Sequence, residues 1–532
     1  MIKKLLKSKI ELLLIVALII LRLPAIGNDE FNTDVWKWKA RSYDFSTGVF
    51  TLDFEKTIQK YHPGVTLMWI GTAGIKVYNL YYDLLLHTSP LDNEINTVFE
   101  LHFVQKLILI FVISLTSIFS FYALKKLTNP TFAIFAFLFM SFEPFYFTLT
   151  RIMHLEGLMT TFMFASFLWY LFYLKEPNKR IRVIISALFG AAAVLTKTTA
   201  LFIIPFIGLI ILIEKRDFKL VAKNFGVWLM LFVAFFFLIW PAMWTHPVEA
   251  VESLYKGIAI VGIEQEHIQL YFGKLVDNPG IFYYPVVAFY RGSILTLIGL
   301  IGLIFTYKKI SDTTIKKIIM YGLLFSLFYI IEITIPSKKL DRYIVPVLSG
   351  LVLSASGFYY YLYSASKNKL LLLFIVVLQL AQVLILHPNY LAYYNPLTGG
   401  FKNGMFVIEP KWTFGQREIE NFFVNEVKKE GFEAHKQGET LDSLLNAPEI
   451  KNKLVVALPE KYYTQLWPFI HRSGAWASIL DISAHSMNSN YVMYPVWDDQ
   501  SKSEDRFEME YKDSIYLGGV AIYNVYQKDQ NY

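Results

Sequence analysis

The sequence predicts a polytopic α-helical membrane protein that carries a small soluble α/β domain at its C-terminal end. Of its 532 residues, 55% are hydrophobic and only 17% are charged, whereas soluble domains usually contain about 25% charged residues. Apolar runs follow one another up to about residue 390, and residues 395–532 have the composition of a soluble domain. The basic residues behind the net charge of +7 lie in short loops between apolar runs. That pattern orients a membrane protein and does not favour nucleic-acid binding.

The apolar runs predict about eleven transmembrane helices, since one spanning helix needs about 20 mainly apolar residues. The first run lacks a small-residue cleavage site, so we expect a retained helix instead of a signal peptide. The two runs on either side of Lys197 are short for two separate spans, so the count depends on how they are divided. The expected helices lie near residues 10–26, 102–123, 131–149, 157–174, 183–196, 198–213, 222–241, 292–307, 315–335, 344–364 and 370–387.

The loops between the runs predict which side of the membrane each one faces. Short loops rich in Lys and Arg stay in the cytoplasm, and four lysines within the first nine residues place the N-terminus there. Every second loop is again basic, which puts residues 27–100, residues 242–291 and the C-terminal domain (395–532) on the outer side of the cytoplasmic membrane. All seven histidines before residue 390 also fall on that side. We therefore expect function on the outer face of a transmembrane domain that comprises residues 1–394.

Several kinds of chemistry have no support in the sequence. The chain has no Cys, which excludes disulfides, thiol catalysis and thiolate metal sites. It has no Walker loop, no GxGxxG after a strand, no HExxH and no GxSxG motif. Nucleotide-driven pumping, and hydrolysis by serine or zinc, therefore lack the residues they need.

The first outer loop contains three candidate acids. Residues 27–42 place Asp29, Glu30 and Asp34 beside Trp, Lys and Arg, and these residues alone do not choose between the acids. Further on, a Pro-Gly pair predicts a turn after His62, and the aromatic run behind it would lie along the membrane surface and hold His62 there. An interfacial helix with a capping turn is the simpler explanation of that segment taken alone.

Arg151, His154 and Glu156 lie between two apolar runs, at the outer end of a helix. Ionisable groups at such positions are costly and usually mark a functional or a paired site. At a helix start, His154 and Glu156 could both point into one cavity. The alternative is an ion pair between Arg151 and Glu156 that closes a short loop, and the residues support both explanations equally.

Basic side chains gather at outer helix ends later in the chain. Lys197 separates two apolar runs, where a lysine that extends to the membrane surface is the simple explanation. Lys338, Lys339 and Arg342 form a cluster against the positive-inside trend, suited to hold a phosphate, although anchoring to lipid headgroups is the alternative. Together with the acids and histidines, the set suits transfer of a group from a lipid phosphate. A carboxylate would deprotonate an acceptor hydroxyl, and the cations would stabilise the departing phosphate.

At these segments the chain resembles the GT-C membrane glycosyltransferases, in the branch of the protein O-mannosyltransferases and aminoarabinose transferases. The resemblance covers most of residues 10–400, and it depends on the order and the side of the motifs because no single motif is highly specific. It begins with the acid, Trp and Arg-Ser of the first outer loop and continues through HPGVTLMW, EPFYFTLTRIMHLEGLMTTF, LTKTTA, DNPGIFYYPV, KKLDRY and HPNYLAYYNPLTGG.

The resemblance implies an inverting, mannosyltransferase-like enzyme that moves a sugar from a polyprenyl phosphate to an acceptor hydroxyl. It also implies a catalytic acid in the first outer loop, where relatives commonly carry Asp-Glu a few residues before Trp and Arg-Ser. The spacing to Arg41 and Ser42 favours Asp34 as this general base over the literal pair at 29–30. Val35 follows it where relatives have Glu.

Further roles are implied by the same resemblance. Glu156 stands where relatives often have Asp and is expected to take part in catalysis: it could orient the acceptor, hold a metal or support Asp34. Arg151 and His154 are expected as accessory residues. Members of the wider superfamily differ in their use of a divalent metal, and no ligand set in the sequence decides whether one binds here. The residues expected around the donor phosphate are Arg41, His62, Lys197, Lys339 and Arg342.

The C-terminal domain contains both strand-like and helix-like patterns, which together predict a small α/β fold. Its aromatic residues could stack on sugar rings, although a place in the core is the commoner explanation for any one of them; they are Tyr462, Tyr463, Trp467 and Trp476. Strand-like runs cover residues 453–459, 490–497 and 518–527, and helix-like stretches cover 416–430 and 440–446.

Two other functions compete with a glycosyltransferase. A transporter or flippase of a lipid-linked sugar would carry polar residues near the membrane midplane and two matching repeats, and the sequence shows neither. A non-catalytic protein that keeps the fold would fit Val35. The sugar, the acceptor (a protein, lipid or glycan hydroxyl) and the oligomeric state follow from no pattern in the sequence.

Overall fold

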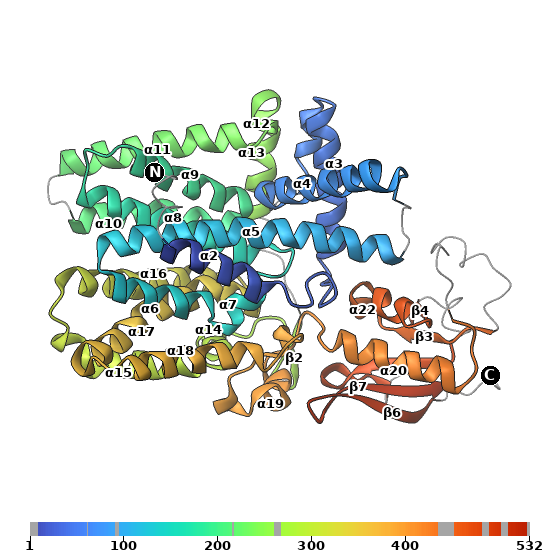
Figure 1. Cartoon of the computed structure of the whole chain (residues 1–532). Coiled ribbons are helices and arrows are strands. Elements are labelled where there is room, and N and C mark those ends of the chain that lie inside the picture. Colours follow the sequence, from blue (N-terminus) through green and yellow to red (C-terminus); the bar gives the residue numbers. More distant parts are fainter. Residues whose placement is uncertain are drawn as a thin grey trace. The chain divides into compact units, whose positions relative to one another are not determined.

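In the computed structural model, the chain is mostly helical and forms two units (Figure 1). The first unit comprises residues 1–24, 38–73 and 106–404, and the second comprises residues 25–37, 74–105 and 405–532. The division predicted at residues 394 and 395 stays a prediction. The structure describes residues 9–60, 62–90, 95–214, 218–259, 268–434, 452–480, 489–501 and 509–528.

Every apolar run of the sequence forms helix, because a backbone inside a membrane must satisfy its hydrogen bonds within itself. Among the described residues, five helices are long and apolar enough to cross a membrane, and a bent pair, α14 (Tyr283–Arg291) with α15 (Ile294–Thr306), makes a sixth span if it counts as one. The protein is thus a multi-pass membrane protein, but the predicted number of eleven spans is not confirmed. The helices of these runs are α2 (Lys9–Arg22), α5 (Ile95–Leu127), α6 (Pro130–Ser141), α7 (Pro144–Leu149), α8 (Leu155–Lys175), α9 (Ile181–Thr196), α10 (Ile203–Glu214), α11 (Phe218–Ile239), α15 (Ile294–Thr306), α16 (Thr313–Thr334), α17 (Val345–Ser366) and α18 (Lys369–Leu384).

Shorter elements connect these helices. The 3-10 helix η3 joins α9 to α10, and the 3-10 helix η6 precedes α17. The predicted turn at Pro63-Gly64 is confirmed, since Gly64 has φ +57° and a Cβ there would overlap the ring of Trp38. The connecting elements are α3 (Val35–Phe50), α4 (Val65–Tyr81), η3 (Thr198–Phe202), α12 (Ala242–Thr245), α13 (Pro247–Lys256), β1 (Gln269–Tyr271), β2 (Lys274–Val276), α14 (Tyr283–Arg291) and η6 (Asp341–Ile344).

Helix α8 is the central helix of the first unit. In its apolar stretch 89% of the residues are buried, against 11% in that of α11. It packs against α9, α10 and α17, and its apolar side chains face all directions, as in a helix that other helices surround. The start of α8 consequently lies inside the bundle, and any polar group placed there is shielded from lipid.

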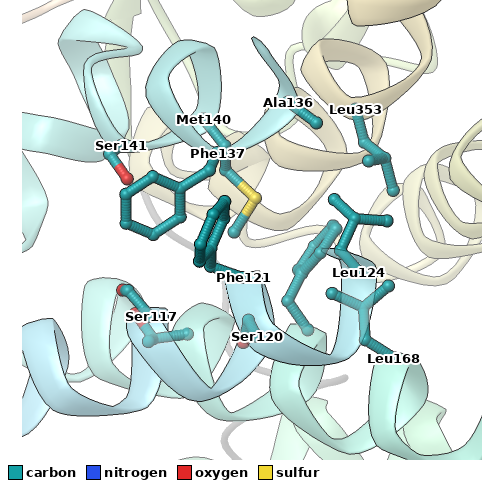
Figure 2. A pocket seen from close by; sticks show the side chains of 12 residues that line it. Ser117, Ser120, Phe121, Leu124, Ala136, Phe137, Met140, Ser141, Leu168 and Leu353 are labelled. Atoms are coloured by element: carbon teal, nitrogen blue, oxygen red, sulfur yellow. The ribbon is translucent and has the colours of Figure 1, made fainter. Parts of the chain in front are cut away.

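The interior of the bundle is closed between α5, α6, α8 and α17. One cavity of about 20 Å³ remains there, which is room for roughly one water molecule. Figure 2 shows the hydroxyl groups of Ser117, Ser120 and Ser141 on its wall, beside the rings of Phe121 and Phe137. A sugar does not fit this cavity, which is therefore not a substrate site.

The second unit contains a five-stranded mixed sheet with the strand order β4-β3-β5-β7-β6. Strand β3 pairs in parallel with β4 and β5, whereas β7 pairs antiparallel with β5 and β6. Two glycines with positive φ, Gly518 and Gly519, form the tight turn between β6 and β7, as short hairpins require. The elements are the end of α19 (Gly400–Val407), whose first five residues belong to the first unit, α20 (Gln416–Lys429), β3 (Val455–Leu458), α22 (Glu460–Arg472), β4 (Trp476–Ile479), β5 (Tyr491–Pro495), β6 (Met509–Leu517) and β7 (Val520–Lys528).

This sheet confirms the predicted α/β fold of the C-terminal domain. The three strand-like runs are β3, β5 and β7, and the stretch at 416–430 is α20. The helix predicted at 440–446 lies outside the described residues. Strands β4 and β6 and helix α22 were not predicted. The aromatic residues belong mainly to the core, since Tyr462, Trp467 and Trp476 are buried and Tyr463 is half-buried.

Candidate functional site

Glu156 lies in the first turn of α8, inside the first unit. His154 precedes this helix with an extended backbone (φ −149°, ψ 174°). A Cβ on Gly157 would lie 2.6 Å from the carbonyl carbon of Leu149, so glycine allows the end of α7 and the start of α8 to approach. A carboxylate in the first turn is stabilised by the helix dipole. The local sequence thus places a carboxylate at the start of the most buried spanning helix.

Three basic side chains surround the Glu156 carboxylate, which is 1% exposed. His154 Nδ1 contacts Oε2. Lys197 Nζ donates a hydrogen bond to Oε1 at 2.8 Å, and Arg342 Nε lies 3.4 Å from the same oxygen. We call Glu156, His154, Lys197 and Arg342 the Glu156 cluster. Lys197 is 3% exposed, so the simple explanation of a lysine that extends to the membrane surface is wrong.

A break in the helix turns Lys197 into the bundle. Lys197 has an extended backbone (φ −154°, ψ 139°) that ends α9 before η3 begins. The Oγ1 atoms of Thr196 and Thr66 lie 2.6 Å apart, and the carbonyl of Thr196 accepts a hydrogen bond from Gly64 N at 3.2 Å. The turn that follows His62 is therefore attached to the residue next to Lys197.

Arg342 and Tyr343 come from η6, whose start is fixed by a buried ion pair. Asp341 Oδ2 accepts a hydrogen bond from Arg291 Nη2 at 2.7 Å. The ammonium of Lys197 lies 3.7 Å from the centroid of the Tyr343 ring, a favourable cation–π arrangement. One short helix thus supplies both a cation to the Glu156 cluster and the ring that covers its lysine.

A cavity of about 260 Å³ opens at this point, and Lys197 forms part of its wall. Its other polar wall residues include His62, Lys338, Tyr343 and Glu332, and most of the remainder is apolar. A larger groove of about 600 Å³ shares Leu201, Glu332 and Ile335 with the cavity. The remaining wall of that groove consists of apolar side chains of η3, α10 and α16: Phe202, Pro205, Phe206, Leu209, Phe328 and Ile331.

A cationic cavity therefore continues into an apolar groove along α10 and α16. Such a pair of compartments suits an amphiphile with an anionic head and a long apolar chain. The head would meet the lysines, and the chain would lie in the groove.

His62 contributes an uncharged ring to the cavity wall. Burial, and after it the nearby Lys197, lower the pKa of His62 from its usual value to about 3. A neutral imidazole can donate one hydrogen bond and accept another. At neutral pH, His62 can thus bind a phosphate oxygen or a sugar hydroxyl without adding a charge.

Two residues expected around a donor phosphate make other contacts. The guanidinium of Arg41 lies 4.6 Å from the ring centroid of the tryptophan three residues earlier. Lys339 is 2% exposed, and its Nζ donates to the carbonyl of Pro336 at 2.7 Å and to Asn278 Oδ1 at 3.1 Å. Lys338 is the lysine of this pair that lines the cavity. The roles predicted for Arg41 and Lys339 stay predictions.

Arg151 holds the chain that leads into α8. Its guanidinium donates to the backbone carbonyls of Arg22 and Pro24, the latter at 2.7 Å. These contacts attach the end of α2 to the segment before Glu156. Arg151 thus has a supporting position, while His154 belongs to the Glu156 cluster itself.

Asp34 belongs to the second unit, at the residue before α3. Its backbone N–H donates to Asn32 Oδ1 at 2.9 Å. Its carboxylate lies 3.6 Å from Lys37 Nζ, and its side chain is 25% exposed. Asp29 and Glu30, by contrast, are buried. Asp34 is consequently the acid of the three that a solvent-borne acceptor can reach most easily.

No metal site is evident in the part of the chain that the structure describes, where no group of three or more His, Asp or Glu side chains could hold a metal ion. Dependence on a divalent metal therefore stays an expectation from the resemblance alone.

The helix arrangement and the sequence around Glu156 both have known counterparts. Residues 95–244 match the model of the family described as dolichyl-phosphate-mannose-protein mannosyltransferase. ArnT from Cupriavidus metallidurans, in a crystal structure bound to undecaprenyl phosphate, has a similar structure, with a TM-score of 0.50 and 13% identity over 97% of each chain. The chain has the GT-C fold.

A more distant GT-C structure is the oligosaccharyltransferase AglB from Archaeoglobus fulgidus, in complex with an inhibitory peptide and a dolichol-phosphate. Its TM-score is 0.41 and its identity 10%, over 98% of this chain and 74% of that chain. The comparison with curated protein sequences gave no match.

Three residues of the candidate site were not predicted from the sequence. Lys338 was recognised only as part of a basic cluster, and its neighbour was chosen instead. Neither Arg291 nor Glu332 belongs to a motif that carries the resemblance. Glu332 carried a usable signal, since it is a carboxylate inside an apolar run. Arg291 stands directly before the apolar run at 292–307 and carried a similar signal, but no local pattern identifies its partner Asp341, which is 50 positions away along the chain.

Proposed function

We propose that the protein is an integral membrane glycosyltransferase that moves a sugar from a polyprenyl-phosphate donor to an acceptor hydroxyl. One observation carries the proposal: the cationic cavity beside the Glu156 cluster continues into an apolar groove along α10 and α16. A polyprenyl phosphate has the same two parts. The undecaprenyl phosphate bound to ArnT, a protein of similar fold, supports this class of lipid. The family description for residues 95–244 supports a mannose-like sugar.

In this proposal Asp34 is the general base. It takes the proton of the acceptor hydroxyl, whose oxygen attacks the anomeric carbon while the bond from that carbon to the donor phosphate breaks. A single displacement inverts the configuration at that carbon. Asp34 is the most exposed acid of its segment, which supports its choice over the pair at 29–30.

The cavity residues hold the donor phosphate. Lys338 and Lys197 stabilise the negative charge that develops on the departing phosphate, and neutral His62 donates a hydrogen bond to it. Glu156 keeps Lys197 and Arg342 in place through its ion pairs. Arg41 and Lys339 can contribute if they exchange their present contacts for the donor.

The proposal places the reaction on the outer face of the cytoplasmic membrane. The basic inner loops of the sequence support a cytoplasmic N-terminus. The transmembrane domain (1–394) would then present the cavity to the outside, where the C-terminal domain (395–532) also lies.

The test uses the purified full-length chain with radiolabelled polyprenyl-phosphate sugars, mannose among them, and protein, lipid and glycan acceptors. We expect transfer or slow hydrolysis of one donor, and a loss of about 10²–10⁴-fold in rate for Asp34→Asn, the usual contribution of a general base. Glu30→Gln is the matched control and should keep most of the rate.

Three results would overturn the proposal or its assignment of the base. A wild-type chain that acts on none of the donors contradicts the enzyme. An Asp34→Asn variant with full activity removes Asp34 as the base. Movement of the intact donor across a vesicle bilayer, with no bond broken, would instead indicate a flippase.

A further inference from the structure

The segment that carries Asp34 is bound to helix α22 of the C-terminal α/β domain by a row of aromatic rings. Phe31 stacks on Trp36 with ring centroids 5.3 Å apart, and Trp36 stacks on Trp467 at 5.2 Å. Trp36 Nε1 also donates to the backbone carbonyl of Thr464 at 2.7 Å. Stacked rings with a hydrogen-bonded indole fix both the distance and the orientation of a contact.

The beginning of the same segment is held as well. Arg472 donates to Asn28 Oδ1 at 2.5 Å, and two of its nitrogens bond to the carboxylate of Glu420 at 2.9 and 2.6 Å. Phe31 is fully buried and also packs on His102, with ring centroids 4.2 Å apart. Residues 28–36 are therefore attached at both ends, with Asp34 near the second attachment.

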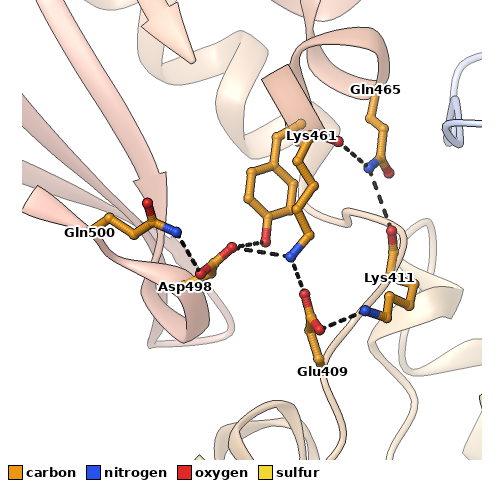
Figure 3. Close-up of polar contacts among 7 residues, drawn as sticks. Glu409, Lys411, Lys461, Gln465, Asp498 and Gln500 are labelled. Carbon is orange, nitrogen blue, oxygen red and sulfur yellow. Dashed lines mark hydrogen bonds and ion pairs between the residues drawn. The ribbon is translucent and has the colours of Figure 1, made fainter. Parts of the chain in front are cut away.

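Helix α22 is a firm support for these contacts. Figure 3 shows Lys461 of this helix between the carboxylates of Glu409 and Asp498, with Gln465 one turn further along. Tyr462 donates from its hydroxyl to Asp498 at 2.7 Å. Because ion pairs and hydrogen bonds attach the first two turns to neighbouring loops, α22 cannot rotate about its axis without breaking them.

We infer that the α/β domain positions the catalytic carboxylate of Asp34, with Trp36, Trp467 and Arg472 as its positioning residues. The inference rests on the proposed function, because it takes Asp34 to be the general base. A base must lie within hydrogen-bond reach of the proton it removes, and a small displacement lowers the rate strongly. The domain thus takes part in every turnover, beyond any role in the choice of acceptor.

The first arm of the test measures attachment without any activity. Since the chain has no Cys, Thr33→Cys introduces a single thiol next to Asp34. We expect slow labelling of this thiol by a maleimide in the otherwise native chain, and at least about tenfold faster labelling when Trp467→Leu is added. Tyr494→Leu is the matched control, because Tyr494 is an equally buried ring of the same domain that packs in the sheet core with Leu480 and Val492.

The second arm measures turnover. Trp467→Leu should lower kcat at least about tenfold and leave the donor KM within about twofold, because it displaces the base and does not touch the donor. Trp467→Phe keeps an aromatic ring and should restore most of kcat. Tyr494→Leu should keep the native kcat. If Trp467→Leu does not fold, Trp36→Leu removes the same stack from its other side.

The outcomes separate the inference from the proposed function. Unchanged labelling in both stack variants shows that the segment is not held by the domain and overturns the inference. Faster labelling with unchanged kcat also overturns it, since the position of Asp34 would then not matter. A native chain that turns over no donor while its labelling responds to Trp467→Leu contradicts the proposed function instead.

Discussion

Glu156 and Asp34 are the two carboxylates proposed to act in catalysis, and the two units hold them in opposite ways. Glu156 is 1% exposed and is surrounded by the charged or basic groups of His154, Lys197 and Arg342. The side chain of Asp34 is 25% exposed, with Lys37 3.6 Å away. Stacked aromatic rings attach its segment to α22.

The difference indicates two different tasks. A carboxylate enclosed by cations holds those cations in place, so in the proposed reaction Glu156 would organise the donor side of the site. A partly exposed carboxylate on a well-supported segment can exchange protons with an arriving hydroxyl, so Asp34 suits the acceptor side. The stability of the fold should accordingly depend on Glu156 and the rate of the reaction on both.

The largest expected effect compares the same change at the two positions. Glu156→Gln leaves Lys197 and Arg342 buried without their counter-ion, and breaking a buried ion pair in this way costs about 3–5 kcal/mol. We expect a strongly lowered melting temperature in detergent and little residual activity. Asp34→Asn should change the free energy of unfolding by no more than about 0.5 kcal/mol, as changes outside the core usually do.

Thermal unfolding followed by circular dichroism or by a dye checks both variants. Equal melting temperatures for the two would break the comparison, because Glu156 would then not organise a charged core. A large loss of stability in Asp34→Asn would also contradict the comparison, because Asp34 would then stabilise the fold as Glu156 does.

The fold could be predicted from the sequence because its signals are local. Each apolar run has the length and composition of a buried or lipid-facing helix, and all of them are helical. The predicted number of spans is not confirmed, since apolar helices such as α6 and α9 have fewer than 18 residues. Strand β4 has four residues, as the predicted strand β3 has, but its sequence WASI includes a serine and lacks the unbroken apolar run VVAL of β3. Its pattern therefore does not separate it from a loop.

The site could be predicted only in part. His154, Glu156 and Lys197 were recognisable because ionisable groups next to apolar runs are costly. Which of Lys338 and Lys339 lines the cavity was not predictable, because the two neighbouring lysines point in different directions but have the same chemistry. The contact of Trp36 with Trp467 joins positions more than 400 residues apart, and no local pattern announces it.

The next largest expected effect is a pH dependence of stability that arises because His62, beside Lys197, stays uncharged in the folded chain. Unfolded His protonates near pH 6.5, whereas burial and Lys197 keep the pKa of His62 at about 3. The unfolded chain therefore gains a proton below pH 6.5 that the folded chain does not, and stability falls as the pH falls. His62→Gln removes this linkage, so relative to wild type it should gain about 2 kcal/mol between pH 7.5 and pH 5.

Melting curves of both chains between pH 7.5 and pH 5 measure this gain. His87→Gln, at an exposed position, is the matched control and should follow the wild-type profile. Parallel profiles for His62→Gln and wild type would show that His62 is not kept neutral by its surroundings.

The smallest expected effect separates donor binding from base catalysis. Lys338 lines the cavity, whereas Lys339 is held by Pro336 and Asn278. One charge-assisted contact to a phosphate contributes about 1.5 kcal/mol or more, so Lys338→Ala should weaken binding of a polyprenyl phosphate about tenfold. Lys339→Ala should change it less, and Asp34→Asn should not change it at all. Titration of the lipid phosphate against each purified variant measures these affinities.

The affinities of these variants for the lipid phosphate show which residues bind the donor and whether Asp34 takes part in donor binding. Weaker binding in Lys338→Ala with native binding in Asp34→Asn keeps the donor side with the Glu156 cluster and the base with the α/β domain. A loss of affinity confined to Lys339→Ala would show that the phosphate binds at Lys339, as the sequence suggests, and not at the cavity wall. Unchanged affinity in Lys339→Ala, in Arg342→Ala and in the double variant would remove the donor role predicted for both residues. In that case the cavity wall formed by His62, Lys197 and Lys338 would hold the phosphate alone.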